Sequence, residues 1–470
     1  MPKKYDVIVI GGGPGGYECA VRFAQLGKKT LCVEKKYWGG TCLNVGCIPS
    51  KVLLDDSKRY WELAHLADHG INIDLDSVKL DFERMMARKD GVVKKLTSGV
   101  KVLLDKNGAD GIIGEARFIG PHELMIKSKD GEDKYSADTI VIATGSAPMR
   151  IPSLGVDDIN VVTSDDVLSL PSVPRSLLVV GGGYIGMEMA SVYKRLGSEV
   201  LIVEILPSIL TGLEPDIVKI AHREFKKQGI EFYLEHKVKN VNVYGGARGV
   251  QVTFESKDGK EEHRTVEKVL VSTGRVPFTE GLDLDKAGIE KTEKGFVKVN
   301  DRLETTAPGV YAIGDVIGGM MLAHKASHEG VALAEHLADG KPAHFKAAIP
   351  YAVFTSPEIA GVGMTEPEAK AQGLEIKTGT FSFKASGKAM ALGEDEGVAK
   401  VIADAKNDDL LGVHVIGPHA SDLVADATLA LEFQASLEDF QAAVRIHPTL
   451  SEAIKEAALN ADKKAINKVN

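Results

Sequence analysis

The sequence has 470 residues, of which 44% are apolar and 26% are charged, and its formal net charge is −9. This balance is typical of a soluble globular protein, and the length predicts two to four domains. The acidic balance argues against a general nucleic-acid binder or a protein attached to anionic membranes, and no apolar run is long enough to span a bilayer. A strand is expected almost directly after Met1, which leaves no room for a targeting segment, so we expect a cytoplasmic protein.

The chain begins with a predicted β–turn–α–β unit. Residues 5–10 are a short β-branched run stopped by glycines, which predicts a buried strand. A helical stretch over 17–26 follows, and a second strand over 30–33 ends at Glu34. The turn between the first strand and the helix carries the spacing G-x-G-x-x-G at Gly11, Gly13 and Gly16.

This arrangement predicts a dinucleotide site. One glycine makes the turn, one lets a pyrophosphate approach the backbone, and one lets the helix and strand pack closely. The helix N-terminus offers unpaired N–H groups and a partial positive charge to a diphosphate, and Glu34 can accept hydrogen bonds from a ribose diol. The alternative is a tight turn that binds no ligand, which the complete strand–turn–helix–strand context disfavours.

A second copy of the unit begins at residue 177. A strand over 177–180 leads into a helix that ends near Leu196, and a strand over 200–203 ends at Glu204. The glycines of this copy are Gly181, Gly183 and Gly186. Two copies predict two nucleotide-binding domains. Glu204 suits the free 2′-hydroxyl of NAD and would repel the 2′-phosphate of NADP, and no arginine directly follows it.

The remaining segments indicate how the chain divides. Runs at 141–145 and 269–274 are matched strand ends that are expected to close the two nucleotide domains. Asp315 follows a short apolar strand, and two interpretations stay open for it: it binds a sugar hydroxyl of the first nucleotide, or it is a turn aspartate. Residues 345–470 carry strand-like and then helical stretches, which predict a separate C-terminal α+β domain.

The four cysteines all lie in the first 50 residues, at Cys19, Cys32, Cys42 and Cys47. This number does not make a secreted disulfide framework, and no second Cys or His pair has zinc-like spacing, so we expect no metal site. Cys19 in a helix and Cys32 in a strand are expected to be buried free thiols.

Cys42 and Cys47 stand five residues apart in the glycine-flanked segment 39–51. In a regular helix this spacing turns about 140° and separates the Cα atoms by about 8–9 Å, whereas a disulfide needs less than about 7 Å. A bonded pair therefore needs a distorted segment, for which Gly46 gives freedom. A strained disulfide beside a cofactor would be catalytic or regulatory, and thiols in a first helical turn have lowered pKa values. The alternative is two buried free thiols.

Segment 39–51, GGTCLNVGCIPSK, resembles the redox-active region of the pyridine nucleotide–disulfide oxidoreductases, and its GCIPSK ending is most similar to the dihydrolipoyl dehydrogenases among them. Other motifs that fit this family are ATGS at 143–146, GGGYIGME at 181–188, YAIGD at 311–315, MLAHKA at 321–326 and HPTLSE at 447–452. The resemblance implies an α/β fold with two Rossmann-like domains, for FAD and NAD, and a C-terminal α+β dimerisation domain. The limits are expected at 1–149 (FAD), 150–273 (NAD), 274–346 (a central domain completing the FAD site) and 347–470 (dimerisation).

The resemblance also implies roles for single residues. Cys47 is expected next to the flavin, Cys42 is expected to exchange with a dithiol substrate, and Lys51 is expected to pair with Glu188. The residues implied for FAD are Glu34, Lys51, Gly114, Thr144, Gly145, Ser146, Asp315, Met321, Leu322, Ala323 and His324. The residues implied for NAD are Gly181, Gly183, Gly186, Glu188, Glu204, Val238 and Gly274.

His447 and Glu452 are the candidate acid–base pair. A thiol with a pKa of about 8.5 is mostly protonated at neutral pH, and a histidine held by a carboxylate is suited to take its proton. The alternative is a surface histidine before a helix. The family implies a cis bond at Pro448 and a dyad supplied by the second subunit of a dimer. Many relatives carry a further histidine at the position of Arg445, so contacts at the dimer or complex surface are expected to differ.

The activity implied by the resemblance is oxidation of protein-bound dihydrolipoyl groups with NAD⁺ by a homodimer. The expected partners are lipoyl domains of 2-oxo acid dehydrogenase complexes or the glycine cleavage carrier protein. A glutathione-type reductase is a related alternative, but Glu204 disfavours NADPH, and a mercuric-ion-type reductase would carry an extra cysteine pair near its C-terminus. A non-catalytic FAD-binding scaffold is disfavoured by the combination of Cys42, Cys47 and the dyad.

Overall fold

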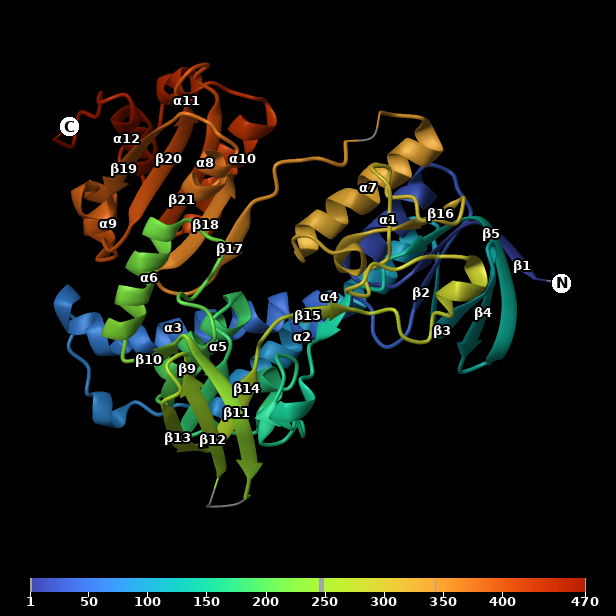
Figure 1. The fold of residues 1–470 in the computed structure, drawn as a ribbon, viewed down its shortest axis with the longest axis horizontal. Helices are drawn as coiled ribbons and strands as arrows, with labels where there is room; N and C mark the ends of the chain where they lie inside the picture. Colours follow the sequence, from blue (N-terminus) through green and yellow to red (C-terminus); the bar gives the residue numbers. More distant parts are fainter. Residues whose placement is uncertain (1, 245–248, 343, 470) are drawn as a thin grey trace.

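The computed structural model describes residues 2–244, 249–342 and 344–469. These residues form three regions, each built around its own sheet (Figure 1). In Figure 1 the N-terminal sheet lies at the right, the sheet of the second region lies below the centre, and the C-terminal sheet lies at the upper left. None of the helices in the described part of the chain has the length and apolarity needed to cross a membrane.

The first region confirms the predicted N-terminal unit. Its sheet has the order β1-β2-β3-β4-β5-β16, with β1 also paired to β5. Parallel strands β1 and β5 are buried at their carboxyl ends, as expected for apolar runs covered on both faces. The edge strand β16 comes from much later in the chain and brings Asp315 to the same sheet edge as the first glycine turn. The strands are β1 (Lys3–Ile10), β2 (Thr30–Glu34), β3 (Asp110–Gly120), β4 (Glu123–Ser128), β5 (Gly131–Ile142) and β16 (Val310–Ala312).

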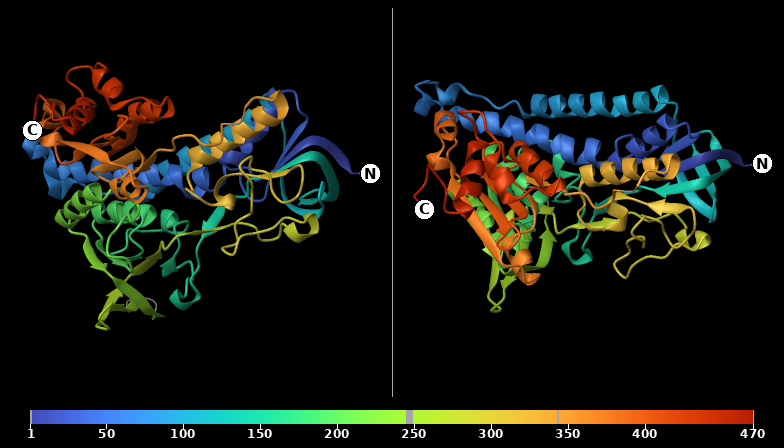
Figure 2. Two further views of the ribbon diagram at one scale, coloured as in Figure 1. Left: turned by 45° about the horizontal axis from the view of Figure 1, so that its top comes forward. Right: turned by 90° about the horizontal axis from the view of Figure 1, so that it is seen from above.

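Among the described residues, five α-helices belong to the first region. Helix α1 (Pro14–Gln25) lies beside α7 (Ala323–Asp339), so segments far apart in the sequence cover one sheet face together (Figure 1). Helix α2 (Gly40–Val45) leads directly into α3 (Cys47–Glu62), and α4 (Phe82–Lys106) lies alongside α3 (Figure 2, right). Helix α3 extends out of the first region and packs against the second, which places the cysteine pair between them.

The second region contains the second β–α–β unit. Its parallel sheet has the order β10-β9-β8-β14-β7, and a three-stranded antiparallel sheet, β11-β12-β13, packs against it. The short strand β15 (Arg275–Pro277) pairs with β6 (Ser146–Pro148) and ties the end of this region to the first. The remaining elements are β7 (Val161–Val162), β8 (Ser176–Val180), α5 (Tyr184–Arg195), β9 (Glu199–Glu204), α6 (Pro215–Lys227), β10 (Glu231–Leu234), β11 (His236–Val243), β12 (Val250–Ser256), β13 (Glu261–Val266) and β14 (Lys268–Val271).

The C-terminal region is the predicted α+β unit. Its antiparallel sheet has the order β17-β18-β21-β20-β19. Successive side chains of a strand point to opposite faces of this sheet, and the two faces belong to different cores. Val413 and Val415 pack under the helices of this region, whereas Ile416 joins the core of the second region. The elements are β17 (Tyr351–Val353), β18 (Glu358–Gly363), α8 (Glu366–Ala371), β19 (Ile376–Ser382), α9 (Gly387–Leu392), β20 (Val398–Asp404), β21 (Leu410–Gly417), α10 (Ala420–Glu432), α11 (Leu437–Ala442) and α12 (Glu452–Ala461).

Candidate active site

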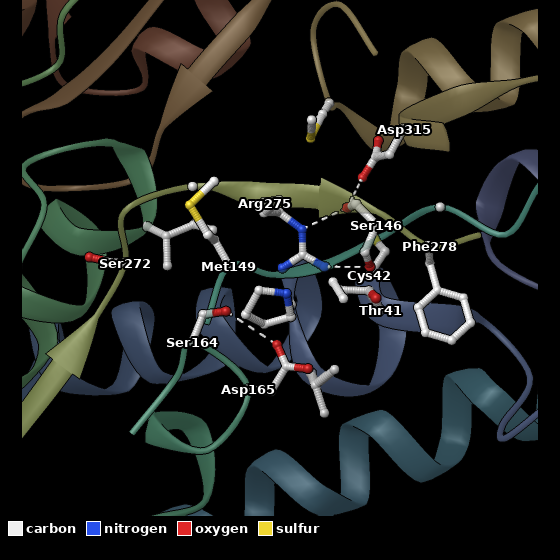
Figure 3. Close-up of a pocket in the computed structure, with 18 of the residues that line it drawn as sticks. Thr41, Cys42, Ser146, Met149, Ser164, Asp165, Ser272, Arg275, Phe278 and Asp315 are labelled. Carbon is white, nitrogen blue, oxygen red and sulfur yellow. Dashed lines mark hydrogen bonds between the residues drawn. The ribbon is translucent and has the colours of Figure 1, made fainter. Parts of the chain in front are cut away.

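One cavity of about 1330 Å³ joins the two glycine turns. Gly11 of the first turn, Gly181 of the second turn, and both Cys42 and Cys47 line it. Figure 3 shows the part of this cavity around Cys42. The two predicted nucleotide sites and the cysteine pair therefore share one space.

The first glycine turn has the three properties that the sequence predicted. Gly11 has a φ of +113°, and a Cβ there would lie 2.2 Å from the Ala143 carbonyl oxygen. A Cβ on Gly16 would lie 1.9 Å from the Gly11 oxygen, so this glycine allows helix α1 to pack on β1. A Cβ on Gly13 would meet nothing closer than 3.8 Å, and the backbone there is open to the cavity.

The second turn repeats this geometry. Gly181 has a φ of +105°, and a Cβ on Gly186 would lie 2.2 Å from the Gly181 oxygen. A Cβ on Gly183 would meet nothing within 4 Å. Each turn thus has one glycine with a positive φ, one that permits close packing, and one with open space beside the N-terminus of a helix. This arrangement suits the binding of a diphosphate.

The two strand-terminal acids hold equivalent positions. Glu34 accepts hydrogen bonds from the Gly12 N–H (2.7 Å) and the Lys36 N–H (2.8 Å). Glu204 accepts them from the Gly182 N–H (2.7 Å) and the Leu206 N–H (2.8 Å). Each carboxylate is fixed by the backbone of its own turn and lines the cavity, where a ribose diol would meet it.

The helical segment that carries Cys42 and Cys47 is interrupted between the two cysteines, as a bonded pair five residues apart would require. Helix α2 ends at Val45 and α3 begins at Cys47, and Gly46 between them has φ −146° and ψ −116°. A Cβ on Gly46 would lie 2.9 Å from the Thr41 carbonyl oxygen, so glycine is needed here for close approach. The break brings the Cys42 and Cys47 sulfurs within hydrogen-bonding reach, with both present as thiols.

The two thiols have opposite acidities. The hydrogen bond from Cys42 lowers the pKa of Cys47 to about 7; burial opposes this shift and the Lys51 ammonium assists it. The same hydrogen bond, with burial, raises the pKa of Cys42 well above its usual range. Both cysteines lie in the first turn of a helix, Cys42 in α2 and Cys47 in α3, but the pKa is lowered only for Cys47, and the hydrogen bond between the two thiols is the first cause of both shifts.

The predicted pair of Lys51 and Glu188 is formed. The Lys51 ammonium donates to both Glu188 oxygens, at 3.1 Å each, and Glu188 also accepts the Phe354 backbone N–H at 3.0 Å. Lys51 Nζ lies 4.4 Å from the centre of the Phe354 ring. These contacts join one residue from each of the three regions beside the cysteine pair.

The predicted pair of His447 and Glu452 is also formed, but it lies outside the cavity lining. His447 Nδ1 lies 2.9 Å from Glu452 Oε1, and the Thr449 N–H donates to Glu452 Oε2 at 2.8 Å. Burial tends to raise the pKa of Glu452, but the hydrogen bonds from Thr449 and His447 outweigh it and lower that pKa. The peptide bond between His447 and Pro448 is cis, as the resemblance implied.

Arg275 is a cavity residue that the sequence analysis missed. Its guanidinium donates to Ser146 Oγ at 2.7 Å and to the Ser146 carbonyl at 2.9 Å, and Ser146 Oγ in turn donates to Asp315 Oδ2 at 2.5 Å (Figure 3). Burial raises the pKa of the nearby Asp165 carboxyl, and the Arg275 charge opposes that rise. A single arginine after Gly274 carries no recognisable sequence signal, because its partners come from distant segments.

One acidic cluster in the described ranges has spacing suited to a metal ion. It consists of Glu214, Asp216 and Glu366. The Lys400 ammonium lies among these carboxylates, at 2.7, 2.6 and 2.6 Å, and the Lys400 side chain is only 2% exposed. A cation of the protein itself therefore fills the centre of the cluster.

Comparison with known proteins agrees with this geometry. Residues 5–330 match the pyridine nucleotide-disulphide oxidoreductase family, and residues 349–458 match the dimerisation domain of that family. The chain belongs to this family. Its relatives named dihydrolipoyl dehydrogenase use FAD and NAD, and the chain is an FAD- and NAD-dependent oxidoreductase.

Relatives of this oxidoreductase match it over nearly the whole chain. The dihydrolipoyl dehydrogenase of Cupriavidus necator is 43% identical over 477 residues, which cover 99% of this chain and 100% of that protein. Mitochondrial dihydrolipoyl dehydrogenase 1 of Arabidopsis thaliana is 46% identical over 459 residues, covering 97% and 90%. Among solved structures, the Cu(II) complex of RclA, an HOCl-induced flavoprotein disulfide reductase of Escherichia coli, has a TM-score of 0.86 at 29% identity, covering 97% and 99%.

Most residues that the sequence analysis implied for cofactors line the shared cavity of the oxidoreductase. Gly16 and Gly186 do not line it, because they are the packing glycines of the two turns. His324 does not line it either; its Nε2 lies 2.7 Å from the Pro350 carbonyl oxygen, on the linker to the C-terminal region. The implied residues that line the cavity are Gly11, Gly13, Glu34, Lys51, Gly114, Thr144, Gly145, Ser146, Gly181, Gly183, Glu188, Glu204, Val238, Gly274, Asp315, Met321, Leu322 and Ala323.

Proposed function

We propose that this oxidoreductase oxidises protein-bound dihydrolipoyl groups with NAD⁺, through Cys42, Cys47 and FAD. The observation that carries the proposal is that Cys42 and Cys47 line the same cavity as the two glycine turns. FAD, when bound at the first turn, carries the electron pair between the cysteine pair and NAD⁺. The relatives named dihydrolipoyl dehydrogenase support this substrate class.

The proposed thiol chemistry uses the difference between the pKa values of Cys42 and Cys47. His447 takes the proton of a substrate thiol, and the resulting thiolate attacks Cys42 in the oxidised pair. The Cys42–Cys47 bond breaks and Cys47 leaves as a thiolate beside the Lys51 ammonium, whose charge lowers the pKa of Cys47 and so makes it a better leaving group. The second substrate thiol then displaces Cys42, which leaves with a proton. The product is an oxidised substrate, a Cys42 thiol and a Cys47 thiolate, which is the protonation pattern that the pKa directions favour.

The proposal includes a homodimer with a shared active site. The His447 side chain is 82% exposed and the dyad does not line the cavity of its own subunit. The match of residues 349–458 to a dimerisation domain supports a second subunit that covers this surface. We therefore expect His447 of one subunit to serve Cys42 of the other.

The substrates are lipoyl domains of 2-oxo acid dehydrogenase complexes or the glycine cleavage carrier protein. A cytoplasmic location suits a thiol pair that must be reduced and oxidised reversibly. We propose the functional domains 1–149 for FAD, 150–273 for NAD, 274–346 for completing the FAD site and 347–470 for dimerisation.

The test measures nicotinamide reduction by the FAD-loaded enzyme. With dihydrolipoamide we expect NADH to form with a far higher kcat/KM than NADPH, because Glu204 accepts a ribose hydroxyl and repels a 2′-phosphate. Reduced glutathione with NADP⁺ is the matched alternative substrate pair. Absence of NADH formation from dihydrolipoamide would remove the proposal, and equal use of NAD⁺ and NADP⁺ would remove the role given to Glu204.

A further inference from the structure

The loop that carries His447 turns most of its side chains outward. It connects α11 to α12, and Val444 is 90% exposed, Ile446 is 78% exposed and the His447 side chain is 82% exposed. Arg445 is the exception, because only 10% of its side chain is exposed. It is also the single arginine in residues 347–470. Within the subunit the Arg445 side chain packs inward, and the expected difference in contacts at the dimer or complex surface stays a prediction.

Arg445 reaches two helices that precede the loop. Its Nε lies 3.5 Å from Oδ2 of Asp426 on α10, and its guanidinium carbon lies 5.2 Å from the centre of the Phe440 ring on α11. Phe440 is 4% exposed and belongs to the core of the C-terminal region. A guanidinium suits both contacts, because it is planar, stays charged and packs on aromatic faces. Its buried Nε makes no hydrogen bond within the described ranges, so charge attraction and packing hold it.

The other contacts of the loop attach His447 and the residues after it to helix α12. Glu452, the first residue of α12, binds the His447 ring and the Thr449 N–H. Thr449 Oγ1 also donates to the Ile446 carbonyl at 2.7 Å, which closes the turn around Pro448. Arg445 connects the other end of the same loop, before His447, to helices α10 and α11.

We propose that Arg445 is a positioning residue for His447: it fixes the start of the loop so that the imidazole meets the substrate thiol at a constant place. The inference rests on the proposed function, in which His447 is the base for dithiol oxidation. A group displaced by about 1 Å can cost about 10²-fold in rate. Arg445→Ala is therefore expected to slow dithiol oxidation by roughly tenfold to a hundredfold, and to leave the reduction of the enzyme by NADH unchanged.

The experiment separates the two half-reactions of the FAD-loaded enzyme by stopped flow. Reduction by dihydrolipoamide and reduction by NADH are measured for Arg445→Ala, Arg445→Lys and Asp426→Asn, each beside a melting curve. Arg445→Lys keeps a cation near Asp426 and should recover most of the dihydrolipoamide rate. The matched control is Lys384→Met, which removes the Lys384–Glu396 ion pair (3.0 Å) of the same region and should leave both half-reactions unchanged.

A double variant tests whether Arg445 acts through His447. If it does, His447→Gln with Arg445→Ala loses no more dihydrolipoamide rate than His447→Gln alone, because groups that act as a unit are not additive. A further loss in the double variant, equal to the loss in Arg445→Ala, would overturn the inference. A fall of both half-reactions together, or a lower melting temperature with normal rates, would also overturn it.

Two further outcomes distinguish a failure of the role proposed for Arg445 from a failure of the role proposed for His447. If His447→Gln oxidises dihydrolipoamide at the normal rate, the proposed function of the dyad fails and the inference fails with it. If His447→Gln is impaired but Arg445→Ala is normal, the inference alone fails. Light scattering at the assay concentration completes the test, since a rate that simply follows a loss of dimer in Arg445→Ala would assign Arg445 to dimer stability instead.

Discussion

Two ion pairs belong to the proposed active site, Lys51–Glu188 and His447–Glu452. They differ in how far the surrounding residues of the same subunit bury them. The Lys51–Glu188 pair lies beside the cysteines, where Glu188 is 7% exposed and also binds the Phe354 backbone. The His447–Glu452 pair is well formed but exposed, with 82% of the His447 side chain open to solvent. One chain thus encloses the carboxylate beside the cysteines, whereas it leaves the histidine of the second pair open to solvent.

The difference has a physical cause. Lys51 and Glu188 come from helices of different regions, and the packing of those regions fixes their separation and removes Glu188 from water, whereas 33% of the Lys51 side chain stays exposed. His447 and Glu452 come from one loop and the helix that follows it, so local hydrogen bonds are enough to form the pair. Local bonds orient a side chain but do not exclude water from it, and an enclosed site strengthens charge interactions. The exposed dyad therefore gains its full effect only in the proposed dimer.

The largest effect is expected when the enclosed centre is broken. Cys47→Ser should lower dihydrolipoamide oxidation by more than about 10⁴-fold, because the leaving thiolate is lost. It should also abolish the long-wavelength thiolate-to-flavin absorbance of the reduced enzyme, which Cys42→Ser should retain. Cys19→Ala, at a fully buried free cysteine that does not line the cavity, is the control. An unchanged band in Cys47→Ser would reverse the roles of the two cysteines.

The next effect sharpens the comparison, because it concerns the exposed pair. His447→Gln should reduce dihydrolipoamide oxidation by about 10²–10⁴-fold, which is the usual contribution of a general base. Reduction by NADH should keep its rate, since that half-reaction needs no thiol deprotonation by His447. Stopped-flow traces of both half-reactions give the measurement. Equal losses in the two, accompanied by a lower melting temperature, would show a structural role beside Pro448 instead.

A smaller loss is expected at the carboxylate of the exposed pair. Glu452→Gln keeps the size of the side chain but removes the charge that orients His447, and a hydrogen bond to a charged group contributes about 1.5–3 kcal/mol. The dihydrolipoamide rate should therefore fall roughly tenfold to a hundredfold, less than in His447→Gln. If Glu452→Gln loses more than His447→Gln, the carboxylate does more than orient the ring.

The smallest effect is a shift in pH dependence. The pKa of Cys47 is lowered from 9.0 to about 7, first by the Cys42 hydrogen bond and then by Lys51 against the effect of burial. In the reduced enzyme the thiolate absorbance should therefore be complete above about pH 9 and should disappear as pH falls through about 7. The stabilisation linked to this thiolate has the same sign: it is present above the unfolded pKa and lost as pH falls through the folded one.

Replacement of the hydrogen-bond donor tests the cause of that shift. Cys42→Ala should move the midpoint of the absorbance titration upward, because the largest lowering influence on Cys47 is gone. Lys51→Met should also move it upward, by a smaller amount, since the Lys51 charge is the lesser influence. A midpoint that stays near pH 7 in Cys42→Ala would show that the hydrogen bond is not the main cause.

The sequence by itself determined the features that depend on neighbouring residues. The glycine turns at Gly11 and Gly181 were predictable because a strand, a turn and a helix that follow one another are fixed by local backbone preference and apolar periodicity. The break between Cys42 and Cys47 was predictable because helix geometry forbids close sulfurs at that spacing without it. The His447–Glu452 pair was predictable in the same way, from one short motif.

Tertiary structure alone decided the contacts between distant segments. Arg275 reaches Ser146 because β15 pairs with β6, and Glu188 accepts the Phe354 N–H because the C-terminal region packs on the second one. The opposite acidities of Cys42 and Cys47 and the inward packing of Arg445 depend on burial and on partners that adjacent residues do not specify. Desolvation and long-range packing act on a residue only after the regions have assembled, which is why no local pattern in the sequence records them.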